Sequence, residues 1–301
     1  MNKWIAYGSI VLGATFWGLI AFFVKGLTKY GFNSMEITAI RALSALIFLI
    51  ILVLVKYRNE VNVQVKHLPL FIGTGIFSIT FFNWCYFTAI EEMSISIAVI
   101  LLYTAPMFVA VLSYFFLHES MNRKKILAII GTIIGCAFVS GITDISNSQI
   151  TIFGLIVGLG SGLGYALYTI FSKIALKHYS PFSITLYTFI MASAFLIPFT
   201  QLWEKIDSFF HTEVFLYSLG LGLFPTVGAY MLYTTGLKYV EGSTASMLAT
   251  VEPIAAFLLG VFVYSEVLSS FQIIGALLII ISVLFVNYER KMDKKNDISL
   301  S

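Results

Sequence analysis

Charged side chains are scarce in this sequence. Lys, Arg, Asp and Glu together make up 11% of its 301 residues, against about 25% in ordinary soluble domains. No basic stripe is present that could follow a nucleic acid backbone, so we expect no nucleic acid partner. The longest connections between apolar stretches, KYRNEVNVQVKHL and WEKIDSFFHTEV, are too short to fold as domains. A soluble enzyme domain is therefore excluded.

The sequence has few cysteines, and it lacks the signature motifs of several protein classes. The two cysteines, Cys85 and Cys136, lie in apolar segments without CxxC spacing, which indicates neither a disulfide framework nor a metal site. The sequence has no GxxxxGK[ST] loop, so it does not use ATP directly, and no HExxH motif. It also lacks a nucleophile elbow and an Asp/His cluster. We expect no catalytic residues, no metal and no cofactor.

Apolar residues are what the sequence has in excess. They make up 59% of the chain, and the mean hydropathy is +0.93. A membrane-spanning helix needs about 20 mostly apolar residues. Ten stretches meet this requirement, which predicts an all-α integral membrane protein with ten transmembrane helices: 4–24, 35–55, 69–89, 95–116, 126–142, 152–172, 182–202, 214–235, 244–264 and 271–287.

The distribution of Lys and Arg predicts the orientation of these spans. Positive charge in short loops stays on the cytoplasmic side. With the N-terminus in the cytoplasm, 14 of the 18 Lys and Arg residues fall on that side, and the outer loops hold only Lys25, Lys29 and Lys205. An even number of spans then places both termini, including a polar tail at 288–301, in the cytoplasm. We interpret the first apolar run as a span rather than a cleaved signal peptide.

The chain also repeats itself. TAPMFVAVLSYFFLHE and TVEPIAAFLLGVFVYSE align at a shift of 147 positions, and GATFWGLIAFFVK aligns with SGLGYALYTIFSK at a shift of 148. The sequence therefore predicts two five-span repeats, at 1–142 and 152–287. Because five is odd, the second repeat enters the membrane from the opposite side. The loop after Glu119, SMNRKK, is basic, whereas its counterpart after Glu266, VLSSFQ, is not.

These features together resemble the drug/metabolite transporter superfamily, EamA-like branch. The resemblance rests on the inverted repeat, the pair Trp17-Gly18 in span 1, Arg41 in span 2, and the proline-to-glutamate segments of spans 4 and 9. It implies a ten-helix transporter with a central cavity built largely by spans 1, 3, 4, 6, 8 and 9. It does not name a substrate, because the cargoes of the superfamily include amino acids, other metabolites, nucleotide sugars and drugs.

Two charges lie inside the predicted spans, and such residues are functional candidates. Glu252 is about 12 Å into span 9 at 1.5 Å per residue, near the midplane. It can serve as a proton-titratable or amine-binding carboxylate, or it can satisfy backbone donors beside Pro253 or pair with Arg41. Arg41 cannot release its proton, so we favour a structural role for it. The repeat equivalents of these two residues, Ala105 and Phe189, are uncharged.

The prolines and terminal glutamates of spans 4 and 9 are structural or gating candidates. Pro106 and Pro253 remove a helix hydrogen bond and free a carbonyl group near Leu102 and Ala249. We expect a fixed kink at each, with a hinge as the alternative. Glu119 and Glu266 lie at span ends, where we expect capping or loop anchoring, with gating as the alternative.

Polar-tipped aromatic residues and one amide in mid-span are candidates for binding a substrate. Their N–H and O–H groups need partners when buried, and aromatic walls suit cations and flat solutes. The alternative for any one of them is packing or a membrane-interface position. The candidates are Trp17, Asn83, Trp84, Tyr86, Tyr103, Tyr165, Tyr168, Tyr230 and Tyr233.

We therefore expect a multi-pass transporter of the cell (plasma) membrane that exports amino acids or related small metabolites by alternating access. Import or facilitated passage of a cationic or aromatic-binding solute is the alternative. A membrane-embedded enzyme or sensor is disfavoured, because only two charges lie in the spans. The expected partners are a small-molecule substrate, the lipid bilayer and protons as a coupling ion. The protein is expected to be a monomer or a homodimer, and small-residue series such as Gly131 and Gly135 suit either close packing or dimerisation.

Overall fold

All regular structure in the described residues, 2–139, 151–264 and 269–299 of a computed structural model, is helical. A helix satisfies every backbone hydrogen bond within its own segment, which apolar surroundings require. The α-helices are α1 (Lys3–Gly18), α2 (Ile20–Thr28), α3 (Ser34–Val55), α4 (Leu68–Ile72), α5 (Phe81–Glu92), α6 (Ile95–Leu102), α7 (Ala105–Phe116), α8 (Arg123–Val139), α9 (Ile152–Ala175), α10 (Pro181–Thr200), α11 (Thr212–Gly222), α12 (Ala229–Leu237), α13 (Gly242–Ala249), α14 (Glu252–Tyr264) and α15 (Ser270–Ser299).

Shorter helical segments of other types join or interrupt these helices. Three are 3₁₀ segments, namely η1 (Arg58–Glu60), η2 (Val65–His67) and η5 (Leu202–Phe210). Two are π-helical, η3 (Gly73–Thr80) and η6 (Leu223–Gly228), and each continues directly into an α-helix. π-Helical turns are rare and occur frequently at functional sites.

Eight continuous helical stretches in the described residues are long and apolar enough to cross a membrane. They correspond to eight of the ten predicted spans. The other two predicted spans fall on α8, which has 17 residues, and on the apolar part of α15, Ser270–Phe285. Large apolar side chains such as Phe116 and Phe262 are exposed on the outside, whereas Thr74, Thr132 and other hydroxyl side chains are buried. This distribution suits a protein surrounded by lipid.

The helix N-termini are closed by the residues that the sequence places there. Ser94, Thr151 and Ser180 accept hydrogen bonds through their side chains at the starts of α6, α9 and α10. Asn33 and Glu36 form a reciprocal capping box at the start of α3. Such caps satisfy backbone donors that have no partner within the helix. They mark where α3, α6, α9 and α10 begin.

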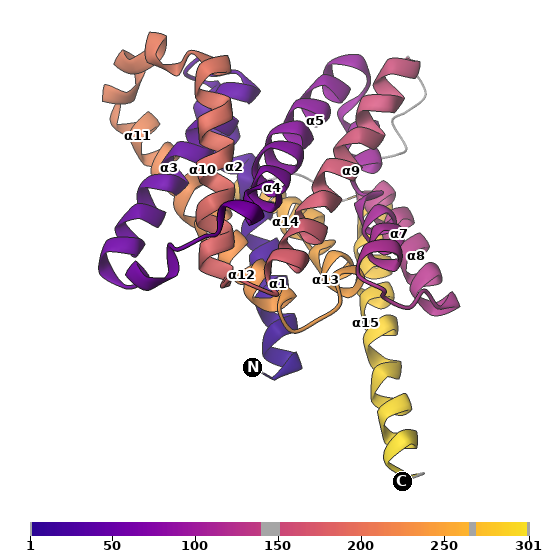
Figure 1. Ribbon diagram of the computed structural model, residues 1–301. Helices are drawn as coiled ribbons and strands as arrows, with labels where there is room; N and C mark the ends of the chain where they lie inside the picture. Colours follow the sequence, from indigo (N-terminus) through magenta and orange to yellow (C-terminus); the bar gives the residue numbers. More distant parts are fainter. Residues whose placement is uncertain (1, 140–150, 265–268, 300–301) are drawn as a thin grey trace.

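The largest helix contacts each join a helix from the first half of the chain to one from the second half. α1 lies along α12, α5 along α9, α3 along α10, and α8 along α15. Figure 1 shows α3, α10 and α11 together on one side and α7, α8 and α15 on the other, with α1, α12 and α13 between them. The start of α1 and the C-terminal end of α15 lie towards the same side of the molecule (Figure 1).

Glycines allow the closest of these contacts. A Cβ atom on Gly135 would lie 2.8 Å from the carbonyl oxygen of Gly275, and one on Gly275 would lie 2.6 Å from that of Gly135. A methyl group at either position would force α8 and α15 apart. Gly135, expected from the sequence to serve packing or dimerisation, therefore lies in an intramolecular contact.

Candidate functional site

Two broken helices meet at the centre of the molecule. α6 ends at Leu102 and α7 begins at Ala105, while α13 ends at Ala249 and α14 begins at Glu252. Each break directly precedes a proline, Pro106 or Pro253, which cannot donate a backbone hydrogen bond. Each helix thus ends at the residue near which the sequence predicted a freed carbonyl group, Leu102 or Ala249.

The residues of both breaks line one small cavity. Its volume is about 10 Å³, and Tyr165 of α9 completes its wall. Thr104 and Thr250 donate their hydroxyl groups to the carbonyl oxygens of Leu101 and Met247, each at 2.6 Å, so part of the interrupted backbone is satisfied. Irregular backbone is tolerated at membrane depth where protein or a cavity surrounds it. The other residues that line the cavity are Leu102, Tyr103, Ala105, Pro106, Ser246 and Ala249.

Glu252 is the first residue of α14 and projects from this break. Its Oε2 accepts a hydrogen bond from the hydroxyl group of Tyr165 at 3.1 Å. No cation lies within ion-pairing distance of Glu252 in the described part of the chain, and the side chain is only partly buried. The direct pairing with Arg41 considered from the sequence is therefore absent here. The carboxyl group keeps acceptor capacity for a proton or a ligand.

Three of the predicted aromatic residues contact Trp17, and a fourth packs against two of these three. The ring centroid of Trp17 lies 5.1 Å from those of Tyr230 and Tyr233 and 5.9 Å from that of Tyr165. Tyr168 packs against Tyr230 at 4.8 Å. Edge-to-face contacts of this length suit the quadrupoles of aromatic rings. α1, α9 and α12 each contribute to this aromatic cluster, which we define as Trp17, Tyr165, Tyr168, Tyr230 and Tyr233.

Hydroxyl groups fix two of the tyrosines in the aromatic cluster. Tyr168 shares a hydrogen bond with Thr234 at 2.8 Å, and Tyr233 shares one with Thr169 at 2.7 Å. All four residues are buried. The two threonines were not predicted from the sequence, because a threonine in an apolar helix usually bonds to its own backbone. These paired hydroxyl groups hold the rings in one orientation.

Arg41, in α3, interacts electrostatically with one member of the aromatic cluster. Its side chain is buried, and its Nε and Nη2 atoms have no acceptor in the described residues. Arg41 interacts electrostatically with Tyr230 and Glu252. Phe189, its repeat equivalent, packs edge-on against Tyr230 at 5.2 Å. Phe189 therefore contacts the tyrosine with which Arg41 interacts electrostatically.

The remaining candidates lie around or away from this centre. Tyr103 is buried at the small cavity, and Tyr86 stacks on Phe82, which in turn contacts Tyr165. Asn83 donates to the carbonyl oxygen of Ile79 in its own helical stretch at 2.6 Å. The side chain of Trp84 is 46% exposed, and it packs beside Phe81 on the outer surface.

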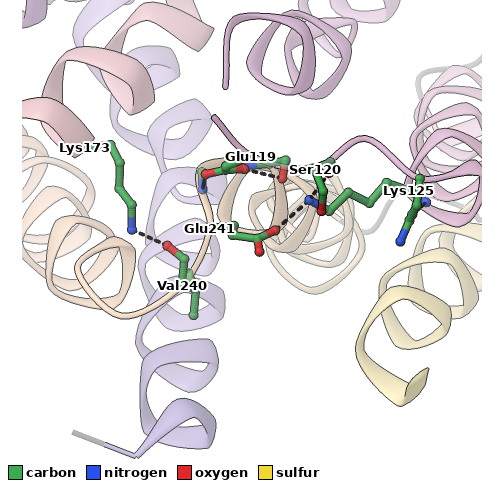
Figure 2. A network of polar contacts seen from close by, with 9 residues as sticks. Glu119, Ser120, Lys125, Lys173, Val240 and Glu241 are labelled. Atoms are coloured by element: carbon green, nitrogen blue, oxygen red, sulfur yellow. Dashed lines mark hydrogen bonds and ion pairs between the residues drawn. The ribbon is translucent and has the colours of Figure 1, made fainter. Parts of the chain in front are cut away.

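A polar network holds one end of the bundle together, where the chain joins α7 to α8 and α12 to α13 (Figure 2). The carboxylate of Glu119 accepts hydrogen bonds from the backbone N–H groups of Gly242 at 2.5 Å and Ser243 at 3.1 Å, and from the Ser243 hydroxyl at 2.6 Å. Glu119 therefore caps α13, which begins at Gly242. The other predicted terminal glutamate, Glu266, lies outside the described residues.

Two lysines complete this network. Lys125 forms an ion pair with Glu241 at 2.6 Å and donates to the carbonyl oxygen of Ser120 at 2.7 Å. Lys173 donates to the carbonyl oxygens of Leu237, at 2.6 Å, and Val240. Figure 2 shows these residues converging on the connection between α12 and α13. An adjacent cavity of about 450 Å³ is lined by Lys3, Leu117, Glu119, Lys173, Leu176, Lys177, Lys238, Tyr239, Val240 and Glu241.

The model of the EamA-like transporter family matches residues 4–141 and 152–288, almost the whole chain. The chain belongs to the EamA-like transporter family. Uncharacterized transporters are among its relatives: one from Archaeoglobus fulgidus is 32% identical, with 92% of this chain and 94% of the relative covered. YwfM of Bacillus subtilis, another uncharacterized transporter, is 31% identical, with 69% of this chain and 70% of the relative covered.

The fold of this EamA-like transporter is also found in a crystal structure of another protein. The two are 16% identical, with a TM-score of 0.78, and the match covers 95% of this chain and 98% of the other. At this identity the likeness concerns the fold alone. Family, relatives and apolar helices together make the protein a multi-pass membrane transporter.

Proposed function

We propose that this EamA-like transporter is a secondary active transporter that exports amino acids or related small metabolites by alternating access. The observation that carries the proposal is Glu252, which projects from a helix break and bonds to Tyr165 of the aromatic cluster. A partly buried carboxylate beside aromatic rings suits the ammonium group of a small metabolite and can also exchange protons. Export is the direction we propose because the family that this chain resembles includes exporters of amino acids.

Alternating access follows from two inverted five-span repeats that rock about a site between them. Several equivalences support this division of the chain. The two helix breaks lie 147 residues apart. A Cβ atom on Gly75 would meet Met191 and Ala192 at 2.7 and 2.9 Å, and one on Gly222 would meet Ser44 and Ala45 at 2.5 and 2.9 Å. The equivalent residues in these two contacts are again 147 positions apart: Gly75 and Gly222, Ser44 and Met191, and Ala45 and Ala192. Each repeat thus makes the same contact with the other.

In this mechanism Glu252 couples substrate movement to the movement of protons. Its repeat equivalent, Ala105, cannot hold a proton, so a carboxylate is not required by the five-span architecture. Proton release from Glu252 on one side of the membrane and uptake on the other would link substrate movement to the proton gradient. The protein would work in the bilayer as a monomer or a homodimer.

Import or facilitated passage of a cationic solute is the second candidate, favoured by the aromatic cluster around Trp17. The two directions give opposite results in cells. Export protects cells that overproduce the substrate or are exposed to its toxic analogues, whereas import sensitises them or rescues auxotrophs. The cell assay therefore separates the two.

The test of coupling is Glu252→Gln in proteoliposomes. We expect flux driven by a pH gradient to be lost, because the amide cannot titrate, while the variant still folds. The substrate is first identified by a thermal-shift screen of the purified protein against a metabolite library. Glu91→Gln, which changes an exposed glutamate at the end of α5, is the matched control. Unchanged pH-dependent flux in Glu252→Gln would exclude the coupling role.

A further inference from the structure

Arg41 is a buried cation whose hydrogen-bonding capacity is unused. Its side chain is 5% exposed, and Nε and Nη2 have no acceptor in the part of the chain that the structure describes. Nε and Nη2 form one edge of the guanidinium group, with two N–H bonds that point the same way. This edge matches the two oxygens of a carboxylate. A buried charged donor left unsatisfied is strongly disfavoured.

A second unpartnered donor belongs to a residue that packs against Tyr230. The Trp17 Nε1 atom is buried and has no acceptor among the described residues, and the Trp17 ring lies 5.1 Å from that of Tyr230. Buried indole N–H groups usually have a hydrogen-bond partner. Two donors without acceptors around one tyrosine indicate that the acceptor comes from a ligand.

Among the described residues, the carboxylate that bonds to the aromatic cluster is that of Glu252. Glu252 bonds to Tyr165, and it interacts with Arg41 electrostatically without forming an ion pair. Both charges interact with the aromatic cluster, because Glu252 accepts a hydrogen bond from Tyr165 and Arg41 interacts electrostatically with Tyr230. A small molecule with an anionic and a cationic end would neutralise both.

We propose that Arg41 binds the carboxylate of the transported molecule through its Nε–Nη2 edge, with Trp17 Nε1 as an additional donor, and that the protein therefore selects substrates carrying a carboxylate. This inference rests on the proposed transport function and makes Arg41 a specificity-determining residue. If Arg41 had only the structural role expected from the sequence, the buried Nε–Nη2 edge of its guanidinium group would remain without an acceptor.

The experiment compares amino acids with derivatives of the same molecules that lack the carboxylate. The purified full-length protein is titrated, with thermal unfolding as the readout, against the proteinogenic amino acids, their α-amides and their decarboxylated amines. The expected result is that at least one amino acid binds and that its amide and amine bind about 30-fold more weakly or worse, as expected for an unpaired buried charge. Equal binding of acid and amide would overturn the proposal, and so would a panel in which no amino acid binds.

Variants of Arg41 and Glu252 show which residue causes the preference for acid over amide. Arg41→Lys keeps the charge but cannot present a fork, so we expect the preference for acid over amide to fall below about tenfold. Arg41→Gln should abolish it, and Glu252→Gln should retain it. Retention of the full preference in Arg41→Lys would overturn the assignment, which keeps the test valid where Arg41→Gln fails to fold. Flux in proteoliposomes separates the two proposals: transport of an amine as fast as its acid contradicts Arg41 alone, whereas no flux of any compound contradicts the transport function.

Discussion

Trp17 combines a packing role with an unused polar atom. Its ring contacts Tyr165, Tyr230 and Tyr233, and 95% of its surface is buried, whereas its N–H group has no partner in the described residues. Truncation to alanine would remove both features and would also leave a cavity costing about 3–5 kcal/mol. Only a substitution that keeps a ring separates binding from packing.

Trp17→Phe is expected to change stability little and binding clearly. The lost part of the indole costs about 1–2 kcal/mol in packing, while loss of the unsatisfied N–H returns about 1–3 kcal/mol. We expect the free energy of unfolding to change by less than about 1 kcal/mol and the substrate affinity to fall about tenfold, the value of one hydrogen bond to a charged group. Chemical denaturation and ligand titration of the purified protein measure the two quantities.

The control for Trp17→Phe is Tyr168→Phe, which removes a hydroxyl group that has a partner. It should lower stability by about 1–3 kcal/mol, because Thr234 is left unsatisfied, with a smaller effect on binding. If Trp17→Phe destabilised the protein as much as Tyr168→Phe and left affinity unchanged, the N–H group would have no role in binding.

The sequence indicated which types of residue form the centre but not which side of a helix they occupy. Trp17 and Tyr165, predicted as repeat mates, contact each other directly. Trp84 was selected by the same reasoning and lies on the exposed surface. A span that is apolar all round gives little periodic signal, so packing decides which of its residues are buried, and in α5 these include Asn83 and Cys85.

At the scale of the element, Glu119 links two helices that are distant in sequence. The chain leaves α7 through His118, whose φ of 55° is left-handed, and the N–H group of Glu119 bonds back to the carbonyl oxygen of Ser113 at 3.1 Å. From there the carboxylate reaches the first N–H groups of α13. A negative charge at a helix N-terminus is also favoured by the helix dipole.

Glu119→Ala is expected to destabilise the protein by about 1–3 kcal/mol, because it removes the cap and leaves two backbone donors without a partner. Thermal unfolding in detergent should show a lower midpoint, and Glu119→Gln, which keeps one acceptor oxygen, should be intermediate. Glu91→Ala, at an exposed position, should leave the midpoint unchanged. A midpoint for Glu119→Ala equal to that of Glu91→Ala would show that the cap contributes nothing.

An irregular backbone was predictable where a side chain causes it. Pro106 and Pro253 predicted a kink with a freed carbonyl group near Leu102 and Ala249, and α6 and α13 end at these residues, because a ring in place of an N–H group has a local effect. The π-helical segments η3 and η6 were not predicted. They depend on tertiary contacts and on hydroxyl bonds five residues back, from Thr80 to Gly75 at 3.2 Å and from Thr226 to Leu221 at 2.7 Å. No local sequence signal distinguishes them from an ordinary helix.

At the scale of the whole molecule, neither half of the chain packs mainly on itself. α1 lies along α12, α5 along α9 and α3 along α10, so the principal contacts of each half are with the other. A repeated sequence predicts the two halves but not this exchange of partners. The exchange brings helices from both halves together, and Arg41 and Glu252 are the charged residues whose counterparts in the predicted repeat are Phe189 and Ala105.

The sequence also predicts how the whole molecule is oriented in the membrane. The distribution of Lys and Arg places the connection between α7 and α8 in the cytoplasm and the segment η5 outside. Arg123 and Glu204 are exposed residues of these two regions, and the native Cys85 and Cys136 are buried. We expect a membrane-impermeant maleimide to label Glu204→Cys in intact cells and to label Arg123→Cys only after lysis. The wild-type chain measures the background, and labelling of Arg123→Cys from outside would reverse the orientation. Export would then begin at the opposite end of the bundle from the cap of Glu119 on α13.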